Sequence, residues 1–350
     1  MSNYITREAV KAAVGTAGAD RDAVIDRVIA QASAEIDQIT DRWFIPRTAT
    51  RSYPWPQRNG SGYVLYIDDA DLLTVTALTK DGDDLTAIAA ADYFAEPVNE
   101  TRKTRIEIDL ASSAFYSAKD TRQRAVRVTG TWGYDDDTVT AGTVVSGLAS
   151  DAAATSMVCS NGALVGVGDT LLIQSEQVEI TAKTTVDLGV NESGALTASV
   201  TDTTLAFSGV PATAVNVGEV LLIGSERMRI REVTTTTAVI VERAYDGSTL
   251  ATHANADDIY VYRTLTIARA VNGTTAAVHA NATQVSRYTV PGDIAGLALA
   301  LAAAYYQAAR GGWTGEIGGG DAAIETRMVA LGKLRDSVRK HYRRHAIAAV

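Results

Sequence analysis

The chain has 350 residues, a formal net charge of −9 and a single cysteine, Cys159. Its length allows more than one hydrophobic core, so two or three domains are expected. The negative charge argues against a protein that coats nucleic acid with its whole surface, and one cysteine excludes an intramolecular disulfide or a cysteine-based zinc site. The N-terminus lacks an apolar signal core and the longest uncharged run, 294–309, is too short to span a bilayer. We therefore expect a soluble protein.

The first segment is predicted to begin with two helices. Thr6 can cap a short helix over residues 7–14 that Gly15 ends, and Asp20 can cap a longer one. From residue 21 to 40, apolar residues recur at spacings of three and four, which indicates an amphipathic helix with one buried stripe.

The apolar period changes to two after Trp43, which predicts strands. They are expected in the stretches RTATRSYPWP, GYVLYIDD, LLTVTALTKDGDDLT, TRIEIDL and AVRVTGTWGY. Asp81 and Gly82 form an Asp-Gly pair, which is typical of tight hairpins, so a turn is predicted there. Helices followed by antiparallel strands indicate an α+β unit.

Two motifs recur out of step in the middle of the chain. Motif A, VGDTLLIQSEQVEI (167–180), returns 50 residues later as VGEVLLIGSERMRI (217–230). Motif B, ERAYDGSTLATHANADDI (242–259), returns 26 residues later as ARAVNGTTAAVHANATQV (268–285). If one module reads A then B, the middle copies form one module and the outer copies form another that encloses it. Short strands with glycine turns fit small β-barrels or sandwiches.

The third segment returns to helix. Pro291 is placed to begin a helix over 294–310, which is apolar on nearly all sides and must be buried on nearly all sides, with part of the cover coming from a neighbouring subunit. A glycine-rich loop, 311–320, follows, and a second helix is expected over 321–345.

Several of these segments, in this order, resemble the head-to-tail connector (adaptor) proteins of long-tailed bacteriophages. They are YITREAVKAAVG, DRWFIPRTATRSY, RVTGTWGY, VPGDIAGLALALAAAYYQAAR and a basic helix ending in HYRRH. In that family the Trp-Gly-Tyr strand is followed within a few residues by the proline that opens the next helix, whereas here about 155 residues separate them. Motifs A and B occupy that gap and look like glycine-turn modules that recur in virion structural proteins. The connector resemblance covers roughly 4–137 and 290–345.

The resemblance implies a structural virion protein of the neck, assembled in the host cytoplasm, and not an enzyme. Such proteins form a ring, commonly of twelve copies, under the portal protein. The ring extends the channel for genomic DNA, which it does not recognise specifically, and offers a docking platform to the next neck or tail-completion protein. The resemblance implies no catalytic residue, cofactor or metal, and no membrane partner. The inserted modules would project outward and could meet the capsid vertex.

Two segments are candidates for contacts with these partners. The C-terminal tail carries a local excess of positive charge that suits the portal or DNA phosphates, although basic residues also suit the C-terminal end of a helix. Its candidate residues are Lys333, Arg335, Arg339, Lys340, Arg343 and Arg344. The loop between the last two helices is the second candidate, through Gly311, Gly312, Trp313, Gly318, Gly319 and Gly320.

Other chemistry-bearing residues have simpler explanations. His253 and His279 occupy the same slot of two motif copies, so a turn-fixing hydrogen bond is favoured over a metal site. The duplicated Ser-Glu pairs of motif A lack a coupled third group, which favours a structural role over a nucleophile. Three adjacent acids, 135–137, do not match the alternation of a calcium loop and are read as a solvated linker.

The predicted architecture is therefore an α+β fold. It consists of a helical connector domain with a small antiparallel sheet (1–142 and 289–350), interrupted by an all-β insertion of two nested small barrel or sandwich modules, outer 143–193 plus 262–288 and inner 194–261. The alternative function is an adhesion or carbohydrate-binding virion decoration protein in which the β-modules do the work. That alternative predicts exposed aromatic clusters on the modules, where the available rings are Phe207 and a few tyrosines.

Overall fold

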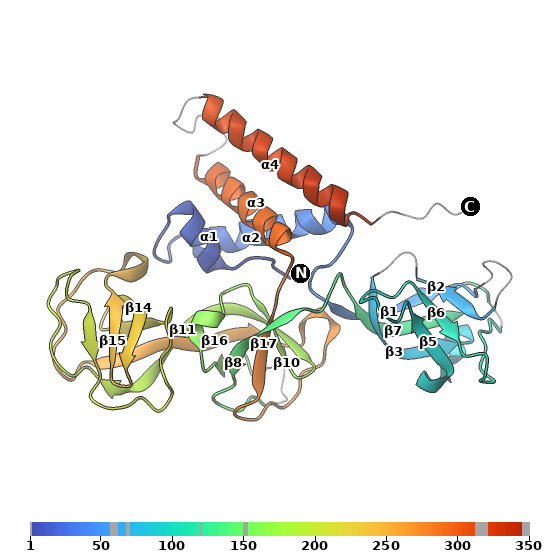
Figure 1. Ribbon diagram of the computed structural model, residues 1–350, viewed down its shortest axis with the longest axis horizontal. Helices are drawn as coiled ribbons and strands as arrows, with labels where there is room; N and C mark the ends of the chain where they lie inside the picture. The colour runs from blue at the N-terminus through green and yellow to red at the C-terminus, as the bar shows by residue number, and fades with distance from the viewer. Residues whose placement is uncertain are drawn as a thin grey trace.

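The computed structural model describes residues 2–56, 62–67, 71–119, 121–149, 153–311 and 321–344. They form four bodies, each with its own hydrophobic core: a helical body, an N-terminal β-domain and two β-barrels. Figure 1 shows the two barrels and the β-domain in a row, with the helices lying across one side of that row.

The helical body joins the two ends of the chain. It contains α1 (Arg7–Val14), α2 (Asp22–Thr40), α3 (Gly292–Gly311) and α4 (Asp321–Tyr342). The apolar stripe of α2 is buried as predicted, and it shares one core with α3 and α4. The main members of this core are Ile25, Val28, Ile29, Ala32, Ile36, Ile294, Leu297, Leu301 and Val338.

The predicted caps of α1 are confirmed, whereas that of α2 is wrong. The Thr6 hydroxyl accepts a hydrogen bond from the amide of Ala9, and Gly15 ends α1 in the left-handed region with φ 64°. At the start of α2 the cap position is occupied by Arg21 rather than Asp20, and its side chain makes no capping hydrogen bond. The chain between Gly15 and α2 is fixed instead by contacts with a barrel, described below.

The N-terminal β-domain contains two antiparallel sheets. One has the order β1-β7-β3-β4 and the other β2-β6-β5. The strands are β1 (Arg47–Tyr53), β2 (Val64–Tyr66), β3 (Leu72–Lys80), β4 (Thr86–Ile88), β5 (Tyr93–Glu96), β6 (Arg105–Ile108) and β7 (Val126–Trp132). The predicted turn at Asp81 and Gly82 is confirmed, because β3 and β4 pair across it with Lys80 opposite Thr86.

The outer barrel is a closed ring of six paired strands. They are β8 (Thr138–Thr143), β17 (Gln284–Tyr288), β10 (Thr170–Ile173), the first part of β11 (Glu176–Asn191), the last part of β16 (Asp258–Ala268) and β9 (Ser156–Val158). The ring closes where Val144, just after β8, pairs with Cys159, just after β9.

The inner barrel repeats this ring with the remaining strands. They are the last part of β11, the first part of β16, β13 (Val220–Ile223), β14 (Glu226–Thr235), β15 (Ala238–Glu242) and β12 (Thr204–Ala206). It closes where Glu192 pairs with Phe207. The closing pairs of the two barrels, Val144 with Cys159 and Glu192 with Phe207, are each offset by 48 residues, so they occupy equivalent positions.

The predicted fold class, a helical connector domain with a small sheet and a β-insertion, is wrong because the described chain is mostly β. Strands outnumber helices in the described chain, and the segment expected to be a helical connector contributes seven of them and most of an eighth, β8. The expected insertion is not a small addition, since its strands together with β8 form one 10-stranded sheet. The physical reason is that β11 and β16 each continue from one barrel into the next and pair with each other along most of their length.

No helix in the described part of the chain is both long and apolar enough to cross a membrane.

Candidate functional site

A buried ion pair lies inside the outer barrel and joins its motif copies. The Glu176 carboxylate accepts hydrogen bonds from Arg269 at 2.9 and 2.6 Å and from the amides of Ala270 and Ala277 at 3.1 and 3.0 Å. The Nε2 atom of His279 lies 2.8 Å from the same carboxylate. Glu176 comes from the first copy of motif A, while the other residues belong to the second copy of motif B.

The inner barrel contains the same arrangement, built from the other two copies. Glu226 accepts from Arg243 at 2.8 and 2.9 Å and from the amides of Ala244 and Ala251 at 2.9 and 3.0 Å. The Nε2 atom of His253 lies 2.9 Å away. The side chains of both glutamates and both arginines have no solvent exposure.

Both carboxylates are held in the charged state. Burial acts to raise the pKa of Glu176, but the hydrogen bonds from Arg269, the Ala277 amide and His279 outweigh it and lower that pKa to about 2. The pKa of Glu226 is lowered to about 2 in the same way, by Arg243 and His253 against burial. A buried ion pair whose remaining polar atoms are hydrogen-bonded makes the segments that it joins rigid.

The structure thus shows the histidines and the glutamates of the Ser-Glu pairs hydrogen-bonded at the turns of motif B. His279 and His253 each bond a carboxylate that also holds the turn at the start of motif B. Sequence reasoning missed the arginines of this network, although both stand in the shared Arg-Ala step of motif B. It also missed a third recurring stretch, TSMVCS (155–160) and TTLAFS (203–208), which contains the strands that close the two barrels.

An aromatic junction joins the helical body to the β-domain. The rings of Tyr4, Phe44, Tyr134 and Tyr342 form a cluster with centroid separations of 5.2 to 5.7 Å. The Tyr342 hydroxyl donates to Asp293 at 2.8 Å, and both burial and this bond raise the pKa of Tyr342. These five residues come from the five separate segments that carry the connector resemblance.

Charged groups close the same junction. Asp71, before β3, accepts hydrogen bonds from Arg42 at 2.6 Å and from Arg344 at 3.1 Å. Arg42 also donates to the carbonyl of Tyr342 at 2.5 Å. On the other side of Tyr4, its hydroxyl donates to Asp37, whose pKa burial raises to about 6. The C-terminal end of α4 is therefore fixed against both α2 and the β-domain.

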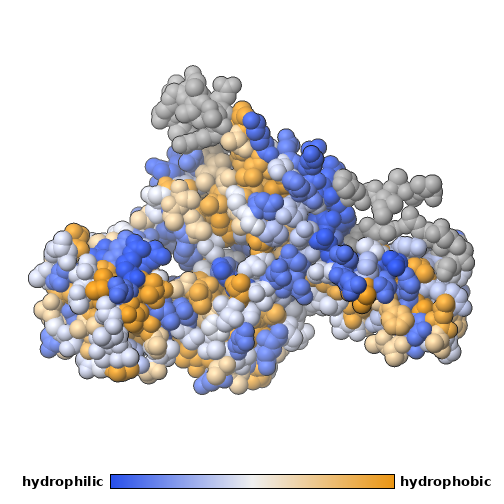
Figure 2. All heavy atoms as spheres, in the orientation of Figure 1, coloured by the Kyte–Doolittle hydropathy of each residue, from blue (hydrophilic) through white to orange (hydrophobic). Residues whose placement is uncertain are grey.

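The candidate tail residues divide into two groups. Arg335 pairs with Glu35 of α2 and Arg344 with Asp71, so these two act within the chain. The other four are exposed and make no ion pair with any described residue: Lys333, Arg339 and Lys340 on α4 and Arg343 just after its end. We call these four the basic face. Figure 2 shows hydrophilic residues gathered over the C-terminal half of α4.

The second candidate segment falls almost wholly outside the described residues. Gly311 is the last residue of α3. Gly312, Trp313, Gly318, Gly319 and Gly320 lie in the stretch 312–320, which the structure does not describe.

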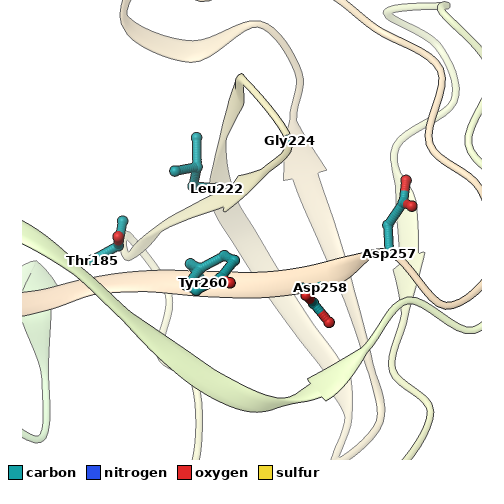
Figure 3. A pocket seen from close by; sticks show the side chains of 6 residues that line it. All are labelled: Thr185, Leu222, Gly224, Asp257, Asp258 and Tyr260. Atoms are coloured by element: carbon teal, nitrogen blue, oxygen red, sulfur yellow. The ribbon is translucent and has the colours of Figure 1, made fainter.

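Several cavities formed by described residues border the inner barrel, and two of them exceed 300 Å³. The first, about 390 Å³, is lined by residues of β11, β13 and β16 and the loops beside them (Figure 3). Its two acids, Asp257 and Asp258, point to opposite sides of the strand, so they do not converge on one point (Figure 3). No group of three metal-ligating side chains occurs among the described residues, the acids at 135–137 included. The second cavity, about 430 Å³, lies between α1, α2 and both barrels.

Comparison of the chain with protein-family models, with curated proteins and with solved structures gives no match.

Proposed function

We propose that this protein is a head-to-tail adaptor of the virion neck of a tailed bacteriophage, which forms a ring beneath the portal protein. The observation that carries the proposal is the aromatic junction. Five segments that resemble connector proteins are spread from Tyr4 to Tyr342, yet each contributes one side chain to this junction. A function is better argued from specific residues that form one site than from the fold as a whole.

In the proposed ring the helical body makes the contacts with the portal. The basic face makes no ion pair with the described residues, so it is available to an acidic portal surface or to the phosphates of DNA in the channel. One side of α3 is only half covered by its own chain, at Ala300, Ala303 and Ala304, and this side would meet the neighbouring copy. The β-domain would provide the platform for the next neck or tail-completion protein, and the barrels would face the capsid vertex.

Electron microscopy of the protein mixed with isolated portal rings tests this proposal. We expect ring-shaped extra density on one end of the portal, whether the free protein is a monomer or a ring. The variant K333E/K340E should lose portal binding, since it reverses two charges of the basic face. The matched control R122E/R124E reverses two exposed charges of the β-domain and should bind normally. A wild-type protein that leaves portal rings undecorated would contradict the adaptor role.

The alternative of an adhesion or carbohydrate-binding protein gains no support from the barrels. Phe207 is buried in the inner core, and Tyr245, Tyr260 and Tyr262 are half-buried. The exposed large apolar side chains of the described barrel residues are aliphatic: Val139, Val145, Leu164, Val200, Val210, Val217, Val233 and Val278. Sugars are recognised by exposed aromatic rings, which these surfaces do not offer.

A further inference from the structure

Equivalent faces of the two barrels contact different segments of the chain. In the outer barrel, the face formed by motif A and the turn of motif B is covered. The Glu179 carboxylate accepts from the Asn3 amide at 3.0 Å, and Gln177 donates to the carbonyl of Pro46 at 3.0 Å. Asn272 donates to the Ser2 hydroxyl at 2.9 Å. The N-terminal segment of the chain therefore occupies this face.

The same face of the inner barrel is only partly covered: Lys11 and the Gly18 amide bond Asp246, and the rest of the face borders a cavity. The offset of 50 residues places Arg227 and Arg229 at the positions of Gln177 and Glu179, and the offset of 26 places Asp246 at that of Asn272. These three residues line the 430 Å³ cavity instead of being covered by an extended segment. Its size lies within the range of ordinary ligand pockets, roughly 300 to 1,000 Å³.

The internal framework of the two faces is nevertheless the same. Gln177 lies 3.3 Å from the hydroxyl of Tyr288, and Arg227 lies 3.2 Å from that of Tyr262, its counterpart. Gln177 bonds Asn272 at 2.8 Å, and Arg227 bonds Asp246 at 2.5 Å. The duplicated module thus keeps a docking geometry that the N-terminal segment covers on the outer barrel and that borders a cavity on the inner barrel.

The charge of the inner-barrel face indicates its occupant. Glu179 of the covered face corresponds to a cation, Arg229, so the sign at this position is inverted. The acids around the cavity are already engaged: Asp22 with Arg7 and Lys11, Asp246 with Lys11 and Arg227, and Glu8 with the amide of Val167. Arg229 makes no ion pair with any described residue and lies with its guanidinium 5.6 Å from the centre of the Tyr245 ring.

We propose that this cavity is the docking site for an acidic, extended polypeptide segment of a partner protein. A peptide carboxylate would bind the guanidinium of Arg229, which suits bidentate pairing with a carboxylate. The walls formed by Tyr245 and Tyr262 would contact the aliphatic part of the segment. The N-terminal segment on the outer barrel shows the mode of binding, in which main-chain and short polar side-chain groups bond the face of the module. The site does not depend on the adaptor role.

Fluorescence anisotropy with the full-length protein tests the site. The probe is a fluorescein-labelled hexapeptide of alternating glutamate and alanine, and its comparison is the same peptide with glutamine in place of glutamate. We expect the acidic peptide to bind at least tenfold more tightly than the neutral one. The variant R229Q should weaken acidic-peptide binding at least tenfold, and A12W, which fills the cavity from α1, should abolish it.

The control is R231Q, on the same strand. Arg231 is 53% exposed, pairs with Glu242 and does not line the cavity, so its replacement should leave binding unchanged. Thermal unfolding of each variant checks that the fold is retained. The proposal is overturned if the acidic peptide does not bind, if R229Q binds it like the wild type, or if both peptides bind equally. Equal competition by inorganic polyphosphate would assign the cavity to phosphate ligands instead and would also overturn it.

Discussion

The outer and inner barrels share their internal network but differ in what holds them in place. Both contain a buried glutamate with an arginine and a histidine, in nearly the same geometry. The motif B turn of the outer barrel packs on β1, whereas that of the inner barrel packs on the connection between α1 and α2. The two copies of the module therefore share their interior, while their surfaces contact different parts of the chain.

The largest expected effect is the loss of stability when the buried glutamate of either barrel is removed. Glu176→Ala and Glu226→Ala each leave a buried arginine without its partner, which costs about 3 to 5 kcal/mol of unfolding free energy. Urea unfolding would measure this cost, and hydrogen exchange would locate it. Because the inner barrel is inserted into the outer one, we expect Glu226→Ala to expose amides of the inner barrel alone and Glu176→Ala to expose amides of both.

The matched control for this pair is Glu242→Ala. Glu242 is 39% exposed and pairs with Arg231 at the surface, so its loss should cost less than about 1 kcal/mol. Identical exchange patterns for Glu176→Ala and Glu226→Ala would show that the two barrels unfold as one unit.

Acid should weaken both barrels equally. The pKa of Glu176 and of Glu226 is about 2 in the folded protein and about 4.3 in an unfolded chain. A lowered carboxyl pKa gives stability that is complete above the unfolded value and is lost as the pH falls toward 2, amounting to roughly 3 kcal/mol per site. Urea unfolding at pH 7, 4 and 3 would measure it. In Glu226→Gln the decline should be shallower, and an unchanged slope would exclude this carboxylate as the cause.

The motif B turns of the two barrels are expected to differ in how well they tolerate alanine in place of glycine. Gly273 and Gly247 both have positive φ, 79° and 73°, so alanine costs about 1 to 2 kcal/mol at either position. A Cβ at Gly273 would lie 2.1 Å from the carbonyl oxygen of Thr48, whereas one at Gly247 would lie 3.0 Å from the side chain of Ala17. Gly273→Ala should therefore cost about 1 to 3 kcal/mol more, visible as a lower Tm. Equal Tm values for Gly273→Ala and Gly247→Ala would mean that β1 shifts as easily as the α1–α2 connection to make room for the added methyl group.

The smallest effect concerns the attachment of the inner barrel. The Lys11 ammonium lies 3.0 Å from Asp246 and donates to the carbonyl of Gly18 at 2.6 Å. Lys11→Ala should cost only about 0.5 to 1.5 kcal/mol. Its signature should be faster hydrogen exchange at the Gly18 amide, which bonds Asp246, with outer-barrel amides unchanged. Protection of Gly18 at the wild-type level would show that Lys11 is not needed for this attachment.

Much of the local structure could be predicted from the sequence, because it depends on neighbouring residues. The stripe of α2, the cap at Thr6 and the turn after β3 follow from spacing and side-chain chemistry alone. The arginine partners of Glu176 and Glu226 lie 93 and 17 residues away, and no local rule indicates such a pairing. The continuation of β11 and β16 through both barrels could not be predicted for the same reason, since it depends on pairing between strands that lie far apart in the sequence.

The route of the chain through β11 and β16 has a consequence for how such a protein can arise. Thr184 of β11 and Thr264 of β16 lie opposite each other, at the place where the outer barrel ends and the inner one begins. Viewed from the outer barrel, these strands are the two arms of a hairpin, and the whole inner barrel occupies the position of its loop. A host fold can accept a long insertion at a hairpin tip at little entropic cost, because closure entropy grows slowly with loop length. Removing the insert and restoring a short turn should leave the register of the host strands intact.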